Sequence, residues 1–352
     1  MKEIHEILQE AVERKASDIF IVSGFPLSYK INDVIQPAEG EKLMPDTTEA
    51  LLRQIYELDG DRKIEQLIHT GDDDFSFSIK GLGRFRCSAY KQRNSLAAVL
   101  RVVYFNLPDA ESLGIPSIVT ELSKKKKGLV LITGSAGSGK STTLACIIDR
   151  INRSRCSHII TIEDPIEFLH AHQMSIVSQR EVSHDTKGYV QALRAALRQS
   201  PDVILLGEMR DFETIQTALT AAETGQLVLS TLHTTGASKT IDRIIDVFPA
   251  EQQQQIRIQL SMVLEAVVSQ QLIPAKDGRL IPAFEIMMVN SAIRNLIRES
   301  KTYQIDNAIL AGSAEGMQTM DGDILRLYKE GIISRENALL YAANPEMLGR
   351  KL

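Results

Sequence analysis

The feature that most constrains the fold is the glycine-rich stretch 134–142, which reads GSAGSGKST. It follows the apolar run 128–133 and precedes residues 143–148, whose composition favours a helix. A strand, a glycine-rich loop and a helix in this order form a phosphate-binding loop when the pattern G-x-x-x-x-G-K-S is present. The stretch therefore predicts a nucleoside-triphosphate site in an α/β fold. The alternative is a βα turn that binds nothing.

Each residue type in this loop suits a phosphate ligand. Glycine adopts backbone conformations closed to other residues, so N–H groups can approach phosphate oxygens closely. The helix N-terminus adds partial positive charge, Lys140 supplies a full one, and the Ser141 hydroxyl is suited to holding Mg²⁺. We therefore expect ATP and Mg²⁺ as cofactors, with Ser141 as the metal ligand. The expected nucleotide-binding residues are Gly134, Ser135, Ala136, Gly137, Ser138, Gly139, Lys140, Ser141 and Thr142.

Length and composition limit the class of protein. A chain of 352 residues is too long for one small core and suggests about two domains. Its net charge of −5 argues against bulk electrostatic binding of nucleic acid, so no nucleic-acid partner is expected. The apolar runs are too short for a membrane span and the first residues too charged for a secretory signal, which predicts a cytoplasmic protein. Cys87, Cys146 and Cys156 form no C-x-x-C pair, so neither a disulfide framework nor a structural zinc site is indicated.

The N-terminal third predicts a small mixed α+β domain. We divide the chain into a domain at 1–105, a linker at 106–112, where Asn106 and Pro108 stand, and a second domain at 113–352. Apolar spacing predicts helices at 3–15 and 46–69, and strands at 19–22, 27–31, 74–79, 84–90 and 96–103.

The second domain begins with alternating strands and helices. Between residues 128 and 247 this alternation predicts a parallel sheet with crossover helices. The remainder is expected to be mainly helical, with a long apolar face over 250–272 and a short helix after 290 for which Ser291 is the expected N-cap. Two further helices are expected at 319–330 and 335–343.

Carboxylates follow two of the predicted parallel strands. Glu163 and Asp164 end the first, and Gly207 and Glu208 follow the second. P-loop enzymes usually carry aspartate at that strand end, so the carboxylate here is displaced by one residue and longer. Ligands bind at the carboxyl ends of such strands, and γ-phosphate hydrolysis requires positioning and charge neutralisation. We interpret Glu208 as the residue that polarises water and Glu163 as its partner in the water and metal network. The alternative is that these acids cap helices.

His233 ends a third strand at the same predicted edge, between Thr231 and Thr234, where an imidazole can sense the γ-phosphate. A lone histidine is more often structural, so both interpretations stay open. The P-loop domain has no obvious cationic finger of its own, which suggests that cations come from another domain or subunit. Arginines do recur on the N-terminal strands, and each taken alone is typical of a solvated strand face: Arg84, Arg86 and Arg101.

Taken together, these motifs resemble those of a known family. Residues 134–142, 161–167, 207–211 and 231–234 are similar to the Walker A, Asp box, Walker B and His box of secretion-type hexameric ATPases. Residues 292–299, AIRNLIRE, resemble the box of that sequence in the PilT-type retraction ATPases of type IV pili. Some features, at 17–20 and 338–342, also resemble the PilU-type paralogues. The resemblance extends from about residue 16 to about residue 340.

The resemblance implies a PAS-like N-terminal domain, a RecA-like C-terminal ATPase domain with a helical C-terminal portion, and a homohexamer. It further implies ATP hydrolysis that powers pilus retraction and twitching motility, at the cytoplasmic side of the inner membrane. An inner-membrane platform protein and a paralogous pilus ATPase are the implied partners. Arg86 and Arg101 match the family's arginine-finger strands and would point at the γ-phosphate. The AIRNLIRE helix would couple hydrolysis to retraction, with Ile293, Leu296 and Ile297 packed inward and Arg294 and Arg298 engaging another subunit or element.

Two departures from relatives bear on these expectations. Phe20 stands where many relatives carry histidine, and the chain lacks the four-cysteine zinc insertion of pilus-extension and type II secretion ATPases. The missing cysteines disfavour an assembly or secretion motor, which remains the nearest alternative. Another is an accessory nucleotide-binding paralogue with little turnover. A nucleic-acid translocase is disfavoured because the sequence shows no aromatic-rich basic groove.

Overall fold

The computed structural model describes residues 3–31, 34–60, 62–103, 107 and 109–352. The chain divides into two compact units, the first made of residues 1–106 with 167–169 and the second of residues 107–166 with 170–352. The linker predicted at 106–112 includes residues 106 and 108, which lie outside the described residues. The predicted domain boundaries therefore stay predictions.

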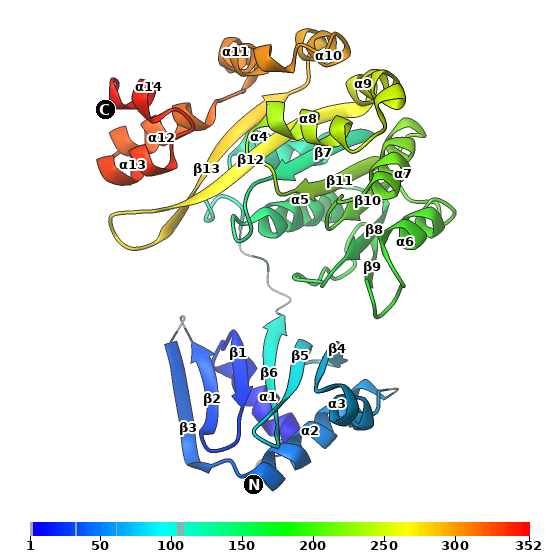
Figure 1. The fold of residues 1–352 in the computed structure, drawn as a ribbon, viewed down its shortest axis with the longest axis vertical. Helices are drawn as coiled ribbons and strands as arrows, with labels where there is room; N and C mark the ends of the chain where they lie inside the picture. Colours follow the sequence, from blue (N-terminus) through cyan, green and yellow to red (C-terminus); the bar gives the residue numbers. More distant parts are fainter. Residues whose placement is uncertain (1–2, 32–33, 61, 104–106, 108) are drawn as a thin grey trace. The chain divides into compact units, whose positions relative to one another are not determined.

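The first unit is a six-stranded antiparallel sheet with strands in the order β3-β2-β1-β6-β5-β4, packed against helices (Figure 1). Its strands are β1 (Asp18–Ile21), β2 (Pro26–Ile31), β3 (Val34–Lys42), β4 (Asp72–Ile79), β5 (Gly83–Gln92) and β6 (Ser95–Val103). Its helices are α1 (Ile4–Glu13), α2 (Pro45–Asp59) and α3 (Ile64–Thr70).

Sequence periodicity explains most of this unit. The buried residues of α1 recur at helical spacing and join the sheet's core, which stacks Phe77 on Phe85 with ring centroids 5.6 Å apart. The prediction of a single helix over 46–69 was wrong. Gly60 adopts φ +76° and ends α2, so the segment forms two helices, α2 and α3. Strand β3 was not predicted, since Ala38 is its single buried residue and the strand has no alternating apolar face.

The second unit contains a seven-stranded sheet in the order β13-β12-β7-β11-β10-β8-β9. All neighbouring strands run parallel except β13, which pairs with β12 antiparallel. The strands are β7 (Gly128–Thr133), β8 (His158–Glu163), β9 (Ile176–Glu181), β10 (Val203–Leu206), β11 (Leu227–Leu232), β12 (Leu264–Pro274) and β13 (Leu280–Met288). The helices are α4 (Ser117–Thr120), α5 (Lys140–Ser154), α6 (Tyr189–Ala196), α7 (Phe212–Glu223), α8 (Ala237–Asp246), α9 (Ala250–Val263), α10 (Ser291–Arg298), α11 (Ile305–Ala311), α12 (Met320–Lys329), α13 (Arg335–Tyr341) and α14 (Pro345–Gly349).

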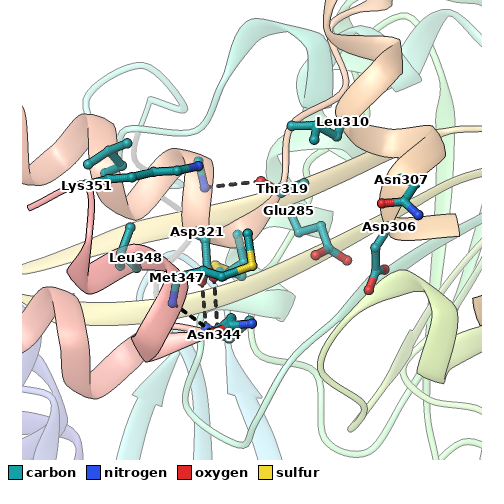
Figure 2. Close-up of a pocket in the computed structure, with 14 residues that line it drawn as sticks. Glu285, Asp306, Asn307, Leu310, Thr319, Asp321, Asn344, Met347, Leu348 and Lys351 are labelled. Carbon is teal, nitrogen blue, oxygen red and sulfur yellow. Dashed lines mark hydrogen bonds between the residues drawn. The ribbon is translucent and has the colours of Figure 1, made fainter. Parts of the chain in front are cut away.

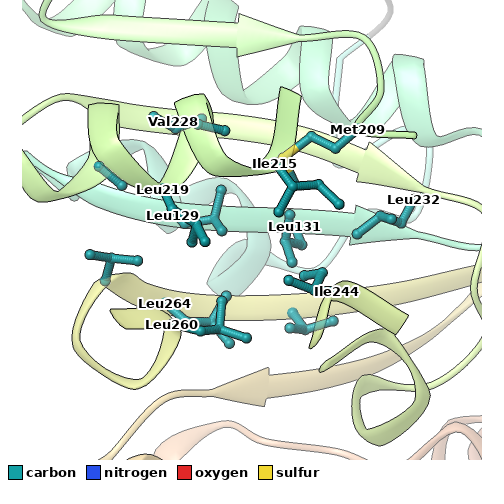
Figure 3. Packing of buried hydrophobic residues seen from close by; sticks show 14 of the residues in the cluster. Leu129, Leu131, Met209, Ile215, Leu219, Val228, Leu232, Ile244, Leu260 and Leu264 are labelled. Atoms are coloured by element: carbon teal, nitrogen blue, oxygen red, sulfur yellow. The ribbon is translucent and has the colours of Figure 1, made fainter. Parts of the chain in front are cut away.

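Both faces of this sheet are covered, which explains why its central strands β7, β10 and β11 are buried at successive positions. Leu129 and Leu131 of β7 belong to the cluster shared with α6 to α11, part of which Figure 3 shows beside Ile215 and Leu219 of α7. The alternate side chains of β7 belong to a second cluster with α4 and α5. The predicted parallel α/β sheet is confirmed.

The prediction that the remainder of the chain is mainly helical was wrong in one part. The apolar face predicted over 250–272 is divided between α9 and β12, and β12 joins the sheet beside β7 and carries β13 on its other side. A run of apolar residues suits either a buried helix or a buried strand, and here pairing with two neighbouring strands decided the outcome. The register between β12 and β7 shifts at Leu264/Ala266, so Glu265 is an extra residue in the strand.

Helix α10 is capped by Asn290, whose side chain accepts a hydrogen bond from the Ile293 N–H at 3.0 Å. The expected cap, Ser291, is instead the first residue of the helix. Both serine and asparagine are common caps, and the backbone of Asn290 is the one in the extended conformation that a cap requires.

Helices α12 to α14 pack on the end of the β12–β13 hairpin that lies next to its turn. The contact is a separate small hydrophobic cluster that includes Ile273 and Ile324. A cavity of about 420 Å³ opens between α11, α12 and α14 (Figure 2). At its edge Asp321 accepts hydrogen bonds from the backbone N–H groups of Ala343 and Asn344 at 2.6 and 2.9 Å. One carboxylate therefore ties α12 to the segment that leads into α14.

Candidate functional site

The predicted site residues of the second unit leave the sheet at one edge. In the parallel registers Leu206 pairs with both Ile162 and Ser230, and Leu232 pairs with Thr133. The carboxyl ends of β7, β8, β10 and β11 are therefore neighbours, and the residues after them emerge together. The structure brings together at this edge the loop 134–142, Glu163, Glu208 and His233, as the sequence predicted.

The loop's glycines are required by its geometry. Gly134 and Gly139 adopt φ +145° and +87°, a region that favours glycine. A Cβ at Gly134 would lie 2.1 Å from the Gln270 carbonyl oxygen, so the backbone approaches β12 too closely for any side chain. Helix α5, of 15 residues, starts at Lys140 directly after this turn, which places a helix N-terminus at the loop.

Within the loop, Lys140 is buried and its Nζ donates to the carbonyl oxygens of Gly134 and Ser135 at 3.0 and 2.8 Å. Ser135, Ala136 and Gly137 are exposed, so the outer part of the loop is open to a ligand. An accessible glycine-rich loop, a buried ammonium and a helix N-terminus form a site for phosphate groups.

The residues present also fit Mg²⁺. This ion keeps several water ligands and takes phosphate oxygens together with one or two oxygens from the protein. The half-buried Ser141 lies in the first turn of α5, and Glu163 and Glu208 stand at the same strand edge. No cluster of three or more histidine, cysteine or acidic ligands is found among the described residues.

Glu208 has two cationic or ionisable neighbours. Its Oε2 lies 2.5 Å from Arg210 Nε and 3.5 Å from His233 Nε2, while the carboxylate itself is 13% exposed. The hydrogen bond to Glu208 raises the pKa of the exposed Arg210 guanidinium. A cavity of about 320 Å³ is lined in part by Glu208, Arg210, His233 and Arg243. The sequence did not predict the ion pair between Glu208 and Arg210. Two residues this close in the chain can point toward or away from each other, and only the side-chain positions show which.

Glu163 is held by neutral donors. Its Oε1 accepts from the Thr161 hydroxyl at 2.6 Å and from Gln179 Nε2 at 3.3 Å. Gln179 belongs to β9, a strand that the sequence did not predict. Hydroxyl and amide donors give this carboxylate a defined orientation.

Tyr189 also reaches this edge and was missed in the sequence. Burial raises the pKa of its phenol, and the charges of Glu208, Asp164 and Glu163 raise it further. A Cβ on Gly207 would lie 2.9 Å from the Tyr189 hydroxyl oxygen, so the phenol occupies the space that a side chain at 207 would need. The signal in the sequence was Gly207, a glycine directly before the candidate carboxylate.

The two predicted arginine fingers belong to the first unit. Arg86 of β5 and Arg101 of β6 are directly opposite each other in the antiparallel register. Like charges in that position destabilise a strand pair. Asp18 of β1, opposite Arg101 on its other side, accepts from Arg101 Nε at 3.1 Å and offsets part of the repulsion.

The AIRNLIRE segment forms α10, where Ile293 and Ile297 are fully buried, as expected, and Leu296 is partly buried. Arg294 engages α9, donating through Nη1 to the carbonyl oxygens of Ser261 and Met262 at 2.6 and 2.9 Å. Its Nη2 lies 3.1 Å from Glu265 Oε1. Arg298 is exposed.

Comparison with known proteins decides the family. The family model described as "Type II/IV secretion system protein" matches residues 1–308. The chain belongs to this family. Among relatives, the type IV pilus retraction ATPase PilT of Pseudomonas aeruginosa is 45% identical over 98% of this chain and 99% of its own length. The type IV pilus ATPase PilU of the same organism is 39% identical over 97% of this chain and 88% of its own.

A solved structure supports the same grouping within the type II/IV secretion system family. The crystal structure of the pilus retraction motor PilT with bound ADP superposes with a TM-score of 0.91 at 46% identity, covering 99% of this chain and 100% of that one. The predicted resemblance to PilT-type ATPases is confirmed, as is the fold class of a β-rich N-terminal domain followed by an α/β ATPase domain. As a member of this group, the chain is a P-loop ATPase.

Proposed function

We propose that this chain is a hexameric ATPase motor that powers type IV pilus retraction, and with it twitching motility. The observation that carries the proposal is the match of the whole chain to PilT, a relative described as a retraction ATPase. The ADP-bound PilT structure supports nucleotide binding by the same fold. The gathering of the phosphate-binding loop, Glu163, Glu208 and His233 at one sheet edge supports hydrolysis at that place.

The chemistry follows from the residues at the strand edge. The loop 134–142 would bind the phosphates of ATP, with the Lys140 ammonium and the α5 N-terminus facing their charge. Mg²⁺ held by Ser141 would neutralise charge on the phosphate oxygens. Glu208 would orient and polarise the attacking water, Glu163 would fix the surrounding water network, and His233 would report the state of the γ-phosphate to Glu208.

We further propose that Arg86 and Arg101 act as arginine fingers at the γ-phosphate in the assembled ring. The support is their placement opposite each other on neighbouring strands despite the repulsion this entails. Arginine fingers stabilise the charge that spreads over the transferring phosphoryl group. Closure and release of such an interface on binding and hydrolysis would supply the rigid-body motion of the motor.

The proposed setting is the cytoplasm, at the inner face of the cell membrane at the pilus base. No helix in the described part of the chain is long and apolar enough to cross a membrane. The proposed partners are five further copies of the chain, the inner-membrane platform protein of the pilus machine and a paralogous pilus ATPase, and no nucleic acid. The similarity to PilU, itself named a type IV pilus ATPase, supports the last of these protein partners.

The test has a biochemical and a cellular part. Purified wild-type chain should release phosphate from ATP with Mg²⁺, while Lys140→Ala and Glu208→Gln should abolish release. Deletion of the gene should leave piliated cells that do not twitch, and the wild-type gene should restore motility where Glu208→Gln does not. Normal twitching in the deletion strain would contradict a retraction role even if ATP is hydrolysed.

An accessory paralogue with little turnover is the second candidate, favoured by the 39% identity to PilU over most of both chains. Identity to PilT is higher, at 45%. Phosphate release separates the two, because an accessory ATPase alone would bind nucleotide without steady turnover. A related secretion or pilus-assembly motor would instead leave deletion cells without pili or without the exported protein.

A further inference from the structure

Gln270 of β12 contacts the phosphate-binding loop, and its side chain is buried, at 4% exposed. Because Ser269 pairs with Thr133 in the parallel register, Gln270 lies next to Gly134, where the loop begins. Its side-chain Nε2 donates to the Ser138 carbonyl oxygen at 2.6 Å. Its Oε1 accepts from the Thr143 hydroxyl at 2.7 Å.

These two hydrogen bonds hold both sides of the loop's last turn. Ser138 lies just before Gly139, where the chain takes a positive φ, and Thr143 lies in the first turn of α5. The side-chain amide thus connects the loop to the start of the helix, with both ends of the amide in use. All three side chains are buried, so water does not replace either bond readily.

Two glycines of the loop also pack closely against Gln270. A Cβ on Gly134 would lie 2.1 Å from the Gln270 carbonyl oxygen, and one on Gly139 would lie 2.7 Å from Gln270 Nε2. The backbone therefore reaches its phosphate-binding conformation by packing on Gln270 at two points. The contact at Gly139 is made by the side-chain amide and the contact at Gly134 by the backbone, so a displaced amide would release the loop at Gly139.

We propose that Gln270 is a positioning residue for nucleotide binding, which fixes the loop conformation that presents the N–H groups of the loop to the phosphates. Its side-chain amide acts through the loop and the first turn of α5, to which it is hydrogen-bonded. The role rests on the proposed nucleotide site and goes beyond it, because β12 lies outside every motif that marks that site. Both ATP and ADP carry the phosphates that such a loop binds, so the effect on the two should be equal.

The neighbouring glutamine offers a matched control. Gln271 lies on the opposite face of β12, where its Nε2 donates to the Tyr341 carbonyl oxygen at 2.9 Å. Substitution of either glutamine by methionine preserves side-chain length and removes the amide. Only Gln270→Met removes bonds to the loop, while Gln271→Met removes a bond to α13.

The experiment measures Mg²⁺–ADP binding by titration calorimetry on the full-length chain, together with ATPase kinetics and thermal unfolding without nucleotide. Gln270→Met should weaken ADP binding about tenfold and raise KM for ATP by the same factor, with kcat lowered less than about threefold. Gln271→Met should bind ADP as wild type does. Equal ADP affinity in Gln270→Met and wild type would overturn the proposal, as would equal weakening in both variants.

A second variant covers the case in which Gln270→Met does not fold. Thr143→Val removes the hydroxyl that fixes Gln270 Oε1 and keeps the side-chain shape, so it should weaken ADP binding by about threefold. Unchanged affinity would overturn the proposal. A wild-type chain that binds no ADP would overturn the proposed function and this role with it, whereas normal binding by wild type and by Gln270→Met would overturn only the role of Gln270.

Discussion

Gly207 shows how a single missing side chain shapes the site. The position lies between the end of β10 and Glu208, and the Tyr189 hydroxyl stands where a Cβ would go. Glycine here makes room for the Tyr189 phenol, whose pKa is raised first by burial and then by the charges of three nearby carboxylates. A side chain at position 207 would compete with this phenol for the same space.

Gly207→Ala should displace Tyr189 or Glu208, because the new Cβ would lie 2.9 Å from the phenol oxygen. We expect ATPase activity to fall about tenfold and stability by about 1–3 kcal/mol. Adding Tyr189→Phe removes the contacted oxygen and should restore most of both, measured by phosphate release and urea unfolding. A double variant no better than Gly207→Ala would show that the phenol is not the cause.

Glu285 gives a prediction for pH. Burial raises the pKa of this carboxyl above its ordinary value of 4.5, and Asp306 and Asp321 raise it further, while a hydrogen bond from the Ala237 N–H at 2.7 Å opposes the shift. The folded chain therefore keeps the proton at a pH where the unfolded chain has lost it. Stability from this group is full below pH 4.5 and is lost as pH rises through the raised folded pKa.

Glu285→Gln should remove that loss, so its stability relative to wild type should increase as the pH rises above 4.5. Urea unfolding of both proteins at several pH values measures the difference, in which the titration of all other groups cancels. Parallel stability curves for the two proteins would contradict the assignment.

Sequence reasoning found the site residues that follow parallel strands, because strand ends of one sheet meet at one edge. Glu163, Glu208 and His233 lie there for that reason. It missed Tyr189 and Gln270, which come from a crossover helix and from a strand read as a helix. Their contacts depend on packing between segments far apart in the chain, which a local pattern does not contain.

At the scale of elements, α9, α10 and β12 form one connected group. Arg294 of α10 satisfies carbonyl groups at the end of α9, where a helix leaves such groups unpaired. Glu265 lies between Arg294 and Lys125, whose Nζ is 2.7 Å from Glu265 Oε2. This group links α10 to the segment that precedes the strand of the phosphate-binding loop.

Arg294→Ala should lower stability by about 1–3 kcal/mol, because it removes the side-chain donor of the Ser261 and Met262 carbonyl groups and leaves Glu265 paired with Lys125 alone. Arg298→Ala, at an exposed position of the same helix, should change stability by less than about 0.5 kcal/mol. Thermal unfolding compares the two. Retraction lost in Arg294→Ala with ATPase activity largely intact would support a coupling role for α10, and loss of both together would reduce that helix to a folding element.

Two elements, β12 and β3, have no distinctive hydrophobic period and could not be predicted from the sequence. Strand β12 looks like a continuation of α9, and β3 is too exposed to alternate. The parallel core was predictable because buried strands with glycine or acidic residues at their ends differ from the amphipathic helices between them.

At the scale of the whole molecule, hydrolysis is expected to depend on residues of both units. Arg86→Ala and Arg101→Ala should lower kcat on the order of a hundredfold or more, while ADP binding to the second unit stays unchanged. Arg53→Ala, an exposed arginine of α2 that pairs with Glu49, is the matched control. Turnover at the wild-type rate in both finger variants would exclude them from the chemistry.

The extra residue at Glu265 has a consequence for how this chain tolerates change. Side chains alternate along β12, so the register set at Glu265 decides that Gln270 faces the loop and Gln271 faces α13. Deleting one residue here would exchange the two glutamines, and with them every core and surface position up to Pro274. Homologous sequences should therefore vary in residue type along this strand while keeping its length constant.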